Sequence, residues 1–343
     1  MFPTHLSRID EISLVNIRRP HVVILGAGAS RAAIPNGDAN GVKVPVMADL
    51  IEILNLGSLL QGTALPNAGR SFEEIYSQIS ESPCLSHIQY ELEARVYEYF
   101  CRLELPKNAT IYDYLVLCLR DKDAIFSFNW DPLLLQAYSR NRNFGSRPRL
   151  YFLHGNVLLG SCCDGTLMGI KGQRCGKCGR QIEPTKLLYP VQEKDYGLTP
   201  LLENQWQELT EHLGEALLLT IFGYSAPKTD VKALQLIGDG WKSRKSQSLK
   251  EVEIIDIRPE SEVIHSWNPL IYSDHYAVTS DFFDSSLAKH PRRTCEVHIA
   301  QVLDCQTAEG NPVPQMDNLA SLQDWFAELL RAESDQRSRK HTD

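Results

Sequence analysis

The sequence predicts an α/β protein built on a doubly wound, Rossmann-like parallel sheet, with a small inserted cysteine-rich zinc module and a helical insertion. Short apolar runs alternate along the chain with longer stretches of helical periodicity, which is the pattern of parallel sheets. Each apolar run ends in glycine or polar residues, as buried parallel strands do. Four of the nine cysteines lie between residues 162 and 178, which is typical of an inserted metal module.

The first predicted strand, residues 21–25, stops at the segment Gly-Ala-Gly-Ala-Ser of residues 26–30. Its two glycines would let the backbone approach a diphosphate, which the N–H groups of the next helix would face. The dehydrogenase fingerprint has a third glycine where this chain has Arg31. It also needs an acid at the end of a second strand, but Asp49 lies in a predicted helix. The loop therefore indicates a nucleotide site and disfavours hydride transfer.

The remaining elements follow from periodicity and from turn residues. Helices are expected at about 45–55, 71–81, 88–103, 110–120, 133–140, 201–213, 229–237 and 319–332. Strands are expected at 124–128, 150–153, 216–222 and 251–257. The charged tail, residues 333–343, is expected to fray. In doubly wound sheets ligands bind outside the carboxyl ends of the strands, so residues that follow these strands are expected to share one crevice.

Several polar residues come directly after predicted strands. The carboxamide of Asn129 suits holding a ribose hydroxyl or an attacking water, whereas Asp131, before a proline, suits capping a helix. His154 is either a general base or, as is commoner for a lone histidine, a core residue bonded to a backbone carbonyl. The segment from Gly223 to Ser225 is either a plain tight turn or a second loop that completes a dinucleotide crevice.

The clustered cysteines include Cys175 and Cys178, whose two-residue spacing lets both thiolates face one tetrahedral metal. The other half of the cluster is a vicinal pair, Cys162 and Cys163, which is a weaker signal than a second such spacing. The pattern favours a structural zinc site over free thiols, with a redox site as the minor alternative. Nothing in the sequence indicates a catalytic metal.

The 343 residues carry a formal charge of −8. This charge argues against a general nucleic-acid or anionic-membrane surface, although it leaves room for a local basic patch. No apolar run approaches the length of a membrane span, and the first residues lack an apolar signal core. An odd number of cysteines with four clustered fits reduced thiols. We therefore expect a soluble, cytoplasmic protein without membrane or direct nucleic-acid partners.

Taken in order, these motifs resemble the sirtuin (silent information regulator) superfamily over about residues 20–260. Sirtuins use NAD⁺, bind it on a Rossmann-like domain and carry a small zinc module. The resemblance implies diphosphate and ribose contacts from Gly26, Ala27, Gly28 and Ser30. It places Asn129 and Asp131 near the nicotinamide ribose, His154 as the base, and Gly223 and Ser225 along the adenosine side. It also implies that Cys162, Cys163, Cys175 and Cys178 hold the Zn²⁺.

Three segments depart from the protein-deacylating sirtuins. Residues 33–38 read Ala-Ile-Pro-Asn-Gly-Asp in place of Gly-Ile-Pro-Asp-Phe-Arg, and Phe128 replaces the glutamine before the asparagine. Residues 186–196 replace the segment that binds the acyl-lysine peptide. Together with Trp206 and residues 223–230, this last segment looks more like the divergent sirtuin-like domains of bacterial antiphage defence. Those domains hydrolyse NAD⁺, often form homo-oligomers, and act with a partner ATPase or a phage-derived activator.

The resulting expectation is a bacterial, cytoplasmic NAD⁺ glycohydrolase that releases nicotinamide and ADP-ribose as a toxic effector. The alternatives are an NAD-dependent protein deacylase and a non-catalytic sensor of NAD or ADP-ribose, and a dehydrogenase is least favoured. The expected NAD-binding domain comprises residues 15–158 and 182–285, with a helical insertion at about 55–120. Residues 159–181 form the expected zinc module, and residues 286–343 form a C-terminal appendage that ends in an amphipathic helix.

Overall fold

The computed structural model of the protein describes residues 5–61, 63, 70–163, 165, 167–190, 199–227, 230–243, 249–271 and 275–340. Parts of two segments singled out above, residues 191–196 and 228–229, lie outside the described residues, as do residues 341–343. Among the described helices, none combines the length and the apolar character that crossing a membrane requires.

The centre of the molecule is a six-stranded, all-parallel sheet with the order β10-β9-β8-β2-β3-β4. Its strands are β2 (His21–Leu25), β3 (Ala124–Ser127), β4 (Arg149–Phe152), β8 (Leu218–Phe222), β9 (Glu251–Ile255) and β10 (His275–Thr279). The chain passes from β2 outward to β4, then returns to β8 beside β2 and continues to β10. This is the doubly wound order of Rossmann folds, and it confirms the predicted fold class.

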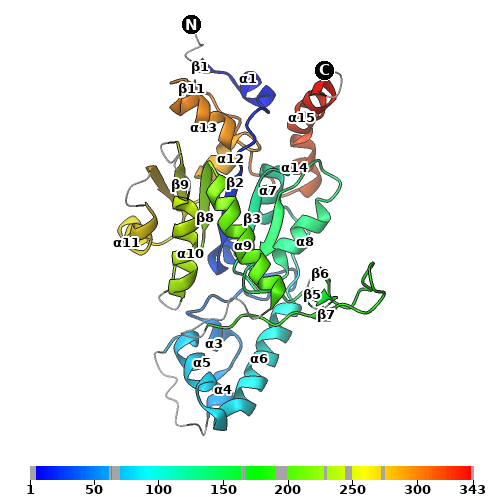
Figure 1. The fold of residues 1–343 in the computed structure, drawn as a ribbon, viewed down its shortest axis with the longest axis vertical. Coiled ribbons are helices and arrows are strands. Elements are labelled where there is room, and N and C mark those ends of the chain that lie inside the picture. Colours follow the sequence, from blue (N-terminus) through cyan, green and yellow to red (C-terminus); the bar gives the residue numbers. More distant parts are fainter. Residues whose placement is uncertain are drawn as a thin grey trace.

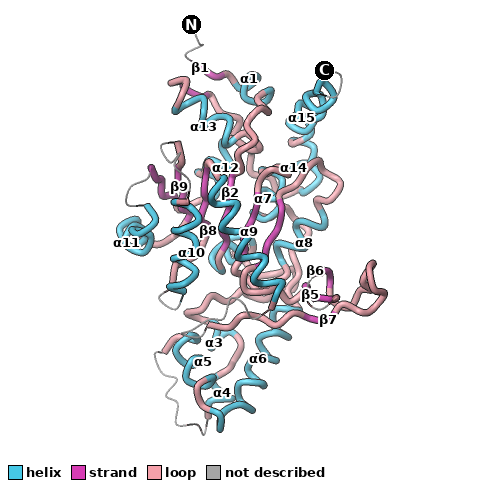
Figure 2. Tube along the Cα trace, in the orientation of Figure 1, coloured by secondary structure: helices cyan, strands magenta, loops and turns pink. Residues whose placement is uncertain are grey.

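Helices cover both faces of this sheet, as Figure 2 shows. Val23 and Leu25 face a core that includes α2 (Ala27–Ala33), α7 (Ile111–Cys118) and α8 (Leu133–Arg140). Val22 and Ile24 face the second core, which includes α9 (Pro200–Glu215), α10 (Val231–Lys242) and α11 (Glu260–Ile271). Because neither face meets water, the central strands are uninterrupted apolar runs, and this made them recognisable in the sequence.

A helical region lies beyond the carboxyl ends of the strands, at the end of the molecule opposite α1 and α15 (Figure 1). It contains α3 (Leu50–Ile53), α4 (Gly57–Leu60), α5 (Phe72–Ser80), the 3₁₀ turn Pro83–Leu85 and α6 (Ser86–Cys101). The helix expected at about 45–55 is shorter than predicted, since only α3 forms there. Trp130 joins this region to the sheet by packing edge-on against Phe100 of α6, with ring centres 5.8 Å apart.

A small antiparallel sheet with the order β6-β5-β7 follows β4. Its strands are β5 (Leu159–Cys162), β6 (Leu167–Ile170) and β7 (Glu183–Pro184).

The chain ends pack together at the amino ends of the strands. Here lie β1 (His5–Leu6), α1 (Arg8–Ser13), α12 (Ser286–Lys289), α13 (Thr294–Val302), β11 (Thr307–Ala308), α14 (Leu319–Trp325) and α15 (Ala327–Lys340). The 3₁₀ turn Phe282–Asp284 precedes α12 and packs through Phe282 on Phe222, the last residue of β8.

Two expectations about the C-terminus were wrong. The helix expected at 319–332 is two helices, α14 and α15, and the tail expected to fray is helical as far as Lys340. Glu333 explains the order of this tail. Its buried carboxylate accepts hydrogen bonds from Arg292 Nε at 2.6 Å and from Arg293 Nη1 at 2.8 Å, and these charge-assisted bonds hold α15 against the domain.

Candidate active site

The predicted site residues follow the carboxyl ends of four neighbouring strands, β8, β2, β3 and β4. Gly26 follows β2, Asn129 follows β3, His154 follows β4 and Gly223 follows β8. The direction in which the chain winds reverses between β2 and β8, and such a switch point is where doubly wound sheets bind their ligands.

A buried hydrogen-bond network lies at the ends of β2 and β3. The Oγ of Ser30 donates to Asp131 Oδ2 at 2.6 Å and lies 2.6 Å from the hydroxyl of Tyr112. The Nδ2 of Asn129 donates to the carbonyl oxygen of Gly26 and to Ser30 Oγ, both at 2.9 Å, and lies 3.2 Å from the Tyr112 hydroxyl. Because a serine hydroxyl has one proton, its bond to Asp131 makes Tyr112 the donor to Ser30.

This network fixes the amide of Asn129. The carbonyl of Gly26 only accepts, so the nitrogen of the amide must face it. The amide oxygen consequently points the other way, and it has no hydrogen-bond partner among the residues that the structure describes. It is the group of the network that remains available to a bound molecule.

Asp131 has both a capping and a site role. Its Oδ1 accepts the backbone N–H of Leu133, the first residue of α8, at 3.1 Å. The N-cap of α8 is Pro132, so Asp131 lies one residue before the cap position that the sequence predicted for it. Its Oδ2 is bonded to Ser30. Burial raises the pKa of Asp131 to about 6, although the hydrogen bonds from Ser30 and Leu133 oppose the shift.

Tyr112 was not among the predicted site residues. It lies in the first turn of α7 and is fully buried. Burial, with the nearby Asp131 carboxylate, raises the pKa of its phenol well above the usual value, so the hydroxyl stays a donor. The capping box of Thr110 and Asp113 marks the start of this helix in the sequence. No sequence signal separates Tyr112 from the apolar residues around it.

His154 is buried just after β4. Its ring packs edge-on against Phe128 at 4.8 Å, and Phe128 stacks on Tyr224 of the β8 loop at 4.2 Å. Trp206, whose indole donates to the carbonyl of Leu153 at 3.2 Å, packs edge-on against Phe128 with ring centres 5.8 Å apart. These four buried aromatic rings join the loop after β4 to the loop after β8.

The two glycine loops pack directly against each other. Gly28 N donates to the carbonyl of Gly223 at 2.9 Å, and a Cβ on Gly26 would lie 2.5 Å from that same oxygen. Gly223 has φ +61°, and its Cβ would lie 2.2 Å from the nitrogen of Ala29. The close approach of the two backbones is enough to require glycine at residues 26, 28 and 223. From the sequence, the glycines of the first loop were expected to make room for a diphosphate. At the rim, Ala27 is half-buried and Ser225 is exposed.

The two positions that depart from the dehydrogenase fingerprint are partners. Arg31 Nη2 forms an ion pair with Asp49 Oδ2, and Asp49 Oδ1 also accepts the backbone N–H of Val46 at 2.8 Å. This carboxylate therefore holds the loop after α2, and it does not follow a strand of the sheet as a ribose-binding acid does.

The four predicted cysteines converge at the end of β5. The sulfur of Cys162 lies 3.1 Å from that of Cys178, and the sulfur of Cys163 lies 3.8 Å from that of Cys175. All four sulfurs lie within 4.8 Å of one another. Zinc–sulfur bonds of about 2.3 Å place tetrahedral sulfurs roughly 3.8 Å apart, so this donor set fits a structural zinc ion.

Comparisons with known proteins give a distant structural likeness. No family model matches the chain, and no curated protein matches it. A solved Sir2 homolog–NAD complex covers 86% of this chain and 93% of its own, at 15% identity and a TM-score of 0.40. A structure on sirtuin substrate affinity covers 83% and 94%, at 15% identity and a TM-score of 0.41. TM-scores of this size do not establish family membership.

Proposed function

We propose that this protein is an NAD⁺ glycohydrolase that cleaves the bond between nicotinamide and ribose with water. The observation that carries the proposal is the locked amide of Asn129, whose oxygen is directed out of a buried network at the switch point of the sheet. The departures from the dehydrogenase fingerprint at Arg31 and Asp49 count against hydride transfer.

The proposed reaction converts NAD⁺ and water into nicotinamide, ADP-ribose and one proton. Nicotinamide leaves as a neutral molecule, so the chain needs only to hold the ribose and to activate one nucleophile. The amide oxygen of Asn129 would orient the attacking water or a ribose hydroxyl, and His154 would take the proton. Asp131, ionised above its pKa of about 6, would favour the positive charge that develops on the ribose ring.

The other predicted residues complete this proposal. The loop of Gly26, Ala27, Gly28 and Ser30 would lie along the diphosphate and ribose, with Gly223 and Ser225 on the adenosine side. The four cysteines would hold a structural Zn²⁺ that stabilises the small sheet after β4. By the resemblance in sequence motifs, the protein would act as an antiphage effector in the bacterial cytoplasm, as a homo-oligomer with a partner ATPase or a phage-derived activator. The proposed domain boundaries remain those given above.

Product analysis tests this proposal. The purified protein is incubated with NAD⁺ alone and with NAD⁺ plus an acetyl-lysine peptide, and the products are separated by chromatography. Equal amounts of nicotinamide and ADP-ribose in both incubations support a glycohydrolase. Peptide-dependent formation of O-acetyl-ADP-ribose would show a deacylase instead, and calorimetric binding of NAD⁺ without products would show a sensor.

A further inference from the structure

A cavity lies at the amino ends of β2, β3 and β4, at the opposite end of the sheet from Asn129. It has a volume of about 670 Å³ and lies between the segment 15–18, the loop 120–122, residues 147–149 and helix α15. A cavity of this size is in the range of small-molecule sites. We call it the amino-end groove.

The amino-end groove is strongly basic, although the chain as a whole has a formal charge of −8. Among the residues that the structure describes, five cationic side chains and two carboxylates line it; the cations are Arg18, Arg120, Lys122, Arg147 and Arg149. One of the carboxylates, Glu333, is already neutralised by Arg292 and Arg293. Arg120 and Lys122 are also paired with carboxylates, so Arg18, Arg147 and Arg149 remain against the single carboxylate of Asp121, and the described lining carries surplus positive charge.

Two of the five cations are committed to internal partners. Arg120 forms a buried ion pair with Glu296, and Lys122 lies 3.1 Å from the carboxylate of Asp123. The charges and hydrogen-bonding groups of these two side chains are therefore used within the protein.

The other three cations form no ion pair with a carboxylate among the residues that the structure describes. Arg18 and Arg149 are exposed. The guanidinium of Arg147 lies 4.0 Å from the ring centre of Tyr138 and donates to the carbonyl of that residue at 2.7 Å. These three arginines come from two separate segments of the chain and line the same cavity.

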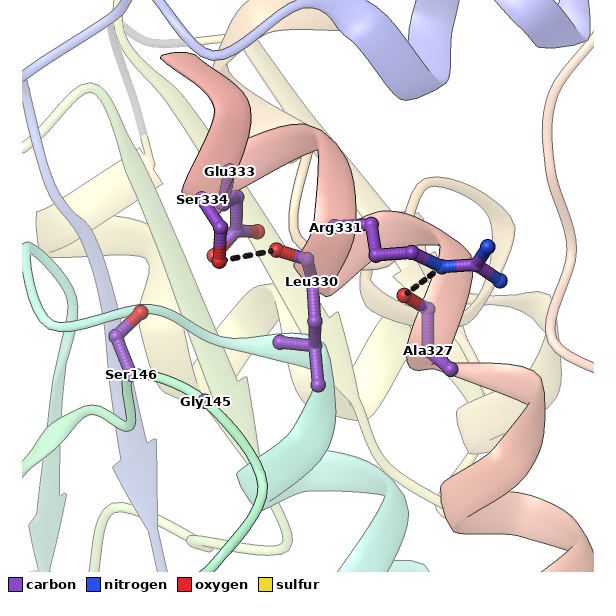
Figure 3. A pocket seen from close by; sticks show the side chains of 7 residues that line it. All are labelled: Gly145, Ser146, Ala327, Leu330, Arg331, Glu333 and Ser334. Atoms are coloured by element: carbon purple, nitrogen blue, oxygen red, sulfur yellow. Dashed lines mark hydrogen bonds between the residues drawn. The ribbon is translucent and has the colours of Figure 1, made fainter. Parts of the chain in front are cut away.

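A neighbouring cavity, which shares Glu333 of α15 with the groove, provides a contrast (Figure 3). It has a volume of about 520 Å³, and Arg331 is the one cationic residue in the described part of its lining. Figure 3 shows the guanidinium of Arg331 directed away from Ser146, and its Nε lies 3.5 Å from the carbonyl of Ala327.

We propose that the amino-end groove binds the phosphate groups of a small polyphosphate ligand of nucleoside triphosphate size. One guanidinium group can donate two parallel hydrogen bonds to two oxygens of a phosphate. Arg18, Arg147 and Arg149 supply three guanidinium groups around one cavity. This site would be separate from the site at Asn129, and it does not depend on the proposed NAD⁺ chemistry.

The test measures the binding of ATP and of inorganic tripolyphosphate by calorimetry. The background is the Asn129→Ala variant, in which NAD⁺ turnover is not expected. The double variant Arg18→Gln/Arg149→Gln is expected to weaken binding of both probes by about tenfold or more. The control is Arg102→Gln/Arg331→Gln, which makes the same change in charge outside the groove and is expected to bind as its parent does. Arg147 is left intact because it packs on Tyr138.

Comparing the two probes shows which part of the ligand is recognised. ATP bound more tightly than tripolyphosphate would identify a nucleotide ligand, and equal binding would identify the phosphates alone as the recognised group. Absence of binding at millimolar concentration, or equal weakening by the control variant, would overturn the proposal. Binding of a single-stranded oligonucleotide without binding of either small probe would also overturn it. Thermal unfolding of both double variants verifies that they are folded.

Discussion

The side-chain amide of Asn129 donates a hydrogen bond of 2.9 Å to the hydroxyl of Ser30, which lies 99 residues earlier in the chain. This bond joins the loop after β3 to the helix after β2 across two adjacent strands. Tyr112 and Asp131 complete the network from two further elements. The geometry of the candidate site is therefore set by four side chains that are buried together.

Removing the hydroxyl of Tyr112 should impair turnover more than binding. In Tyr112→Phe, Ser30 and Asn129 lose a buried partner, so the amide of Asn129 is held less firmly. We expect kcat for nicotinamide release to fall by about tenfold, with little change in KM, since one lost hydrogen bond corresponds to about 1 to 1.5 kcal/mol.

The control for Tyr112 is Tyr114→Phe, on the same helix. The hydroxyl of Tyr114 donates to the carbonyl of Met316 at 2.9 Å and is remote from the network. This variant should unfold more easily but keep its kcat. Equal kcat values for the two variants would contradict a positioning role for Tyr112.

Asp131 should make stability depend on pH in the direction opposite to most carboxylates. Its pKa is about 6 in the folded protein against a reference value of 3.8. Between these pH values the folded protein binds more protons than the unfolded chain, so the free energy of unfolding falls as pH rises. A shift of this size corresponds to roughly 3 kcal/mol.

Urea unfolding of the parent and of Asp131→Asn from about pH 4 to pH 7 measures this effect. The parent should lose stability relative to the variant as pH rises through the interval, because asparagine does not titrate. Carboxylates elsewhere titrate equally in both proteins and cancel in the difference. A difference that stays constant with pH would show that Asp131 is not protonated near pH 6 in the folded protein.

Gly223→Ala should destabilise the fold at the contact between the two glycine loops. Its φ of +61° is unfavourable for alanine, and the new Cβ would meet the backbone of Gly28 and Ala29. We expect a loss of at least about 2 kcal/mol in the free energy of unfolding.

The matched control is Gly238→Ala within α10, where no atom lies within 4 Å of the added carbon. That change should stabilise the helix by up to about 1 kcal/mol. Equal losses in the free energy of unfolding for Gly223→Ala and Gly238→Ala would contradict the close packing of the two glycine loops.

The purified protein should contain one equivalent of zinc, measured by elemental analysis. Cys178→Ser should lose most of it, since three remaining sulfurs form an incomplete tetrahedron. Cys84→Ser, which alters an exposed cysteine outside the cluster, should keep it. A parent protein without zinc, or a Cys178→Ser variant with a full equivalent, would show that the sulfurs hold no metal.

The elements that were predicted are those whose structure follows from residues adjacent in the sequence, such as an apolar run bounded by glycine or polar residues. The apolar runs that became β2, β3, β4 and β8 end where their strands end, so the residues after them were expected together. The edge strand β10 was not predicted, because it is half exposed and has no apolar run.

The features that were missed depend on contacts between distant residues. Tyr112 reaches Ser30 across 82 residues, and Glu333 is held by Arg292 across 41 residues. Neither pairing is visible from local periodicity. The amino-end groove likewise joins basic residues from separate segments, which the overall charge of −8 conceals.

Nicotinamide release from NAD⁺, measured for the parent, Asn129→Ala and His154→Ala, decides whether these residues form the site of hydrolysis. Exposed residues outside the site, changed in Asn143→Ala and His87→Ala, serve as matched controls, and circular dichroism verifies that each variant is folded. We predict that both site variants lose activity by at least about 100-fold while both controls keep it. Full activity in Asn129→Ala or in His154→Ala would contradict the assignment of the site.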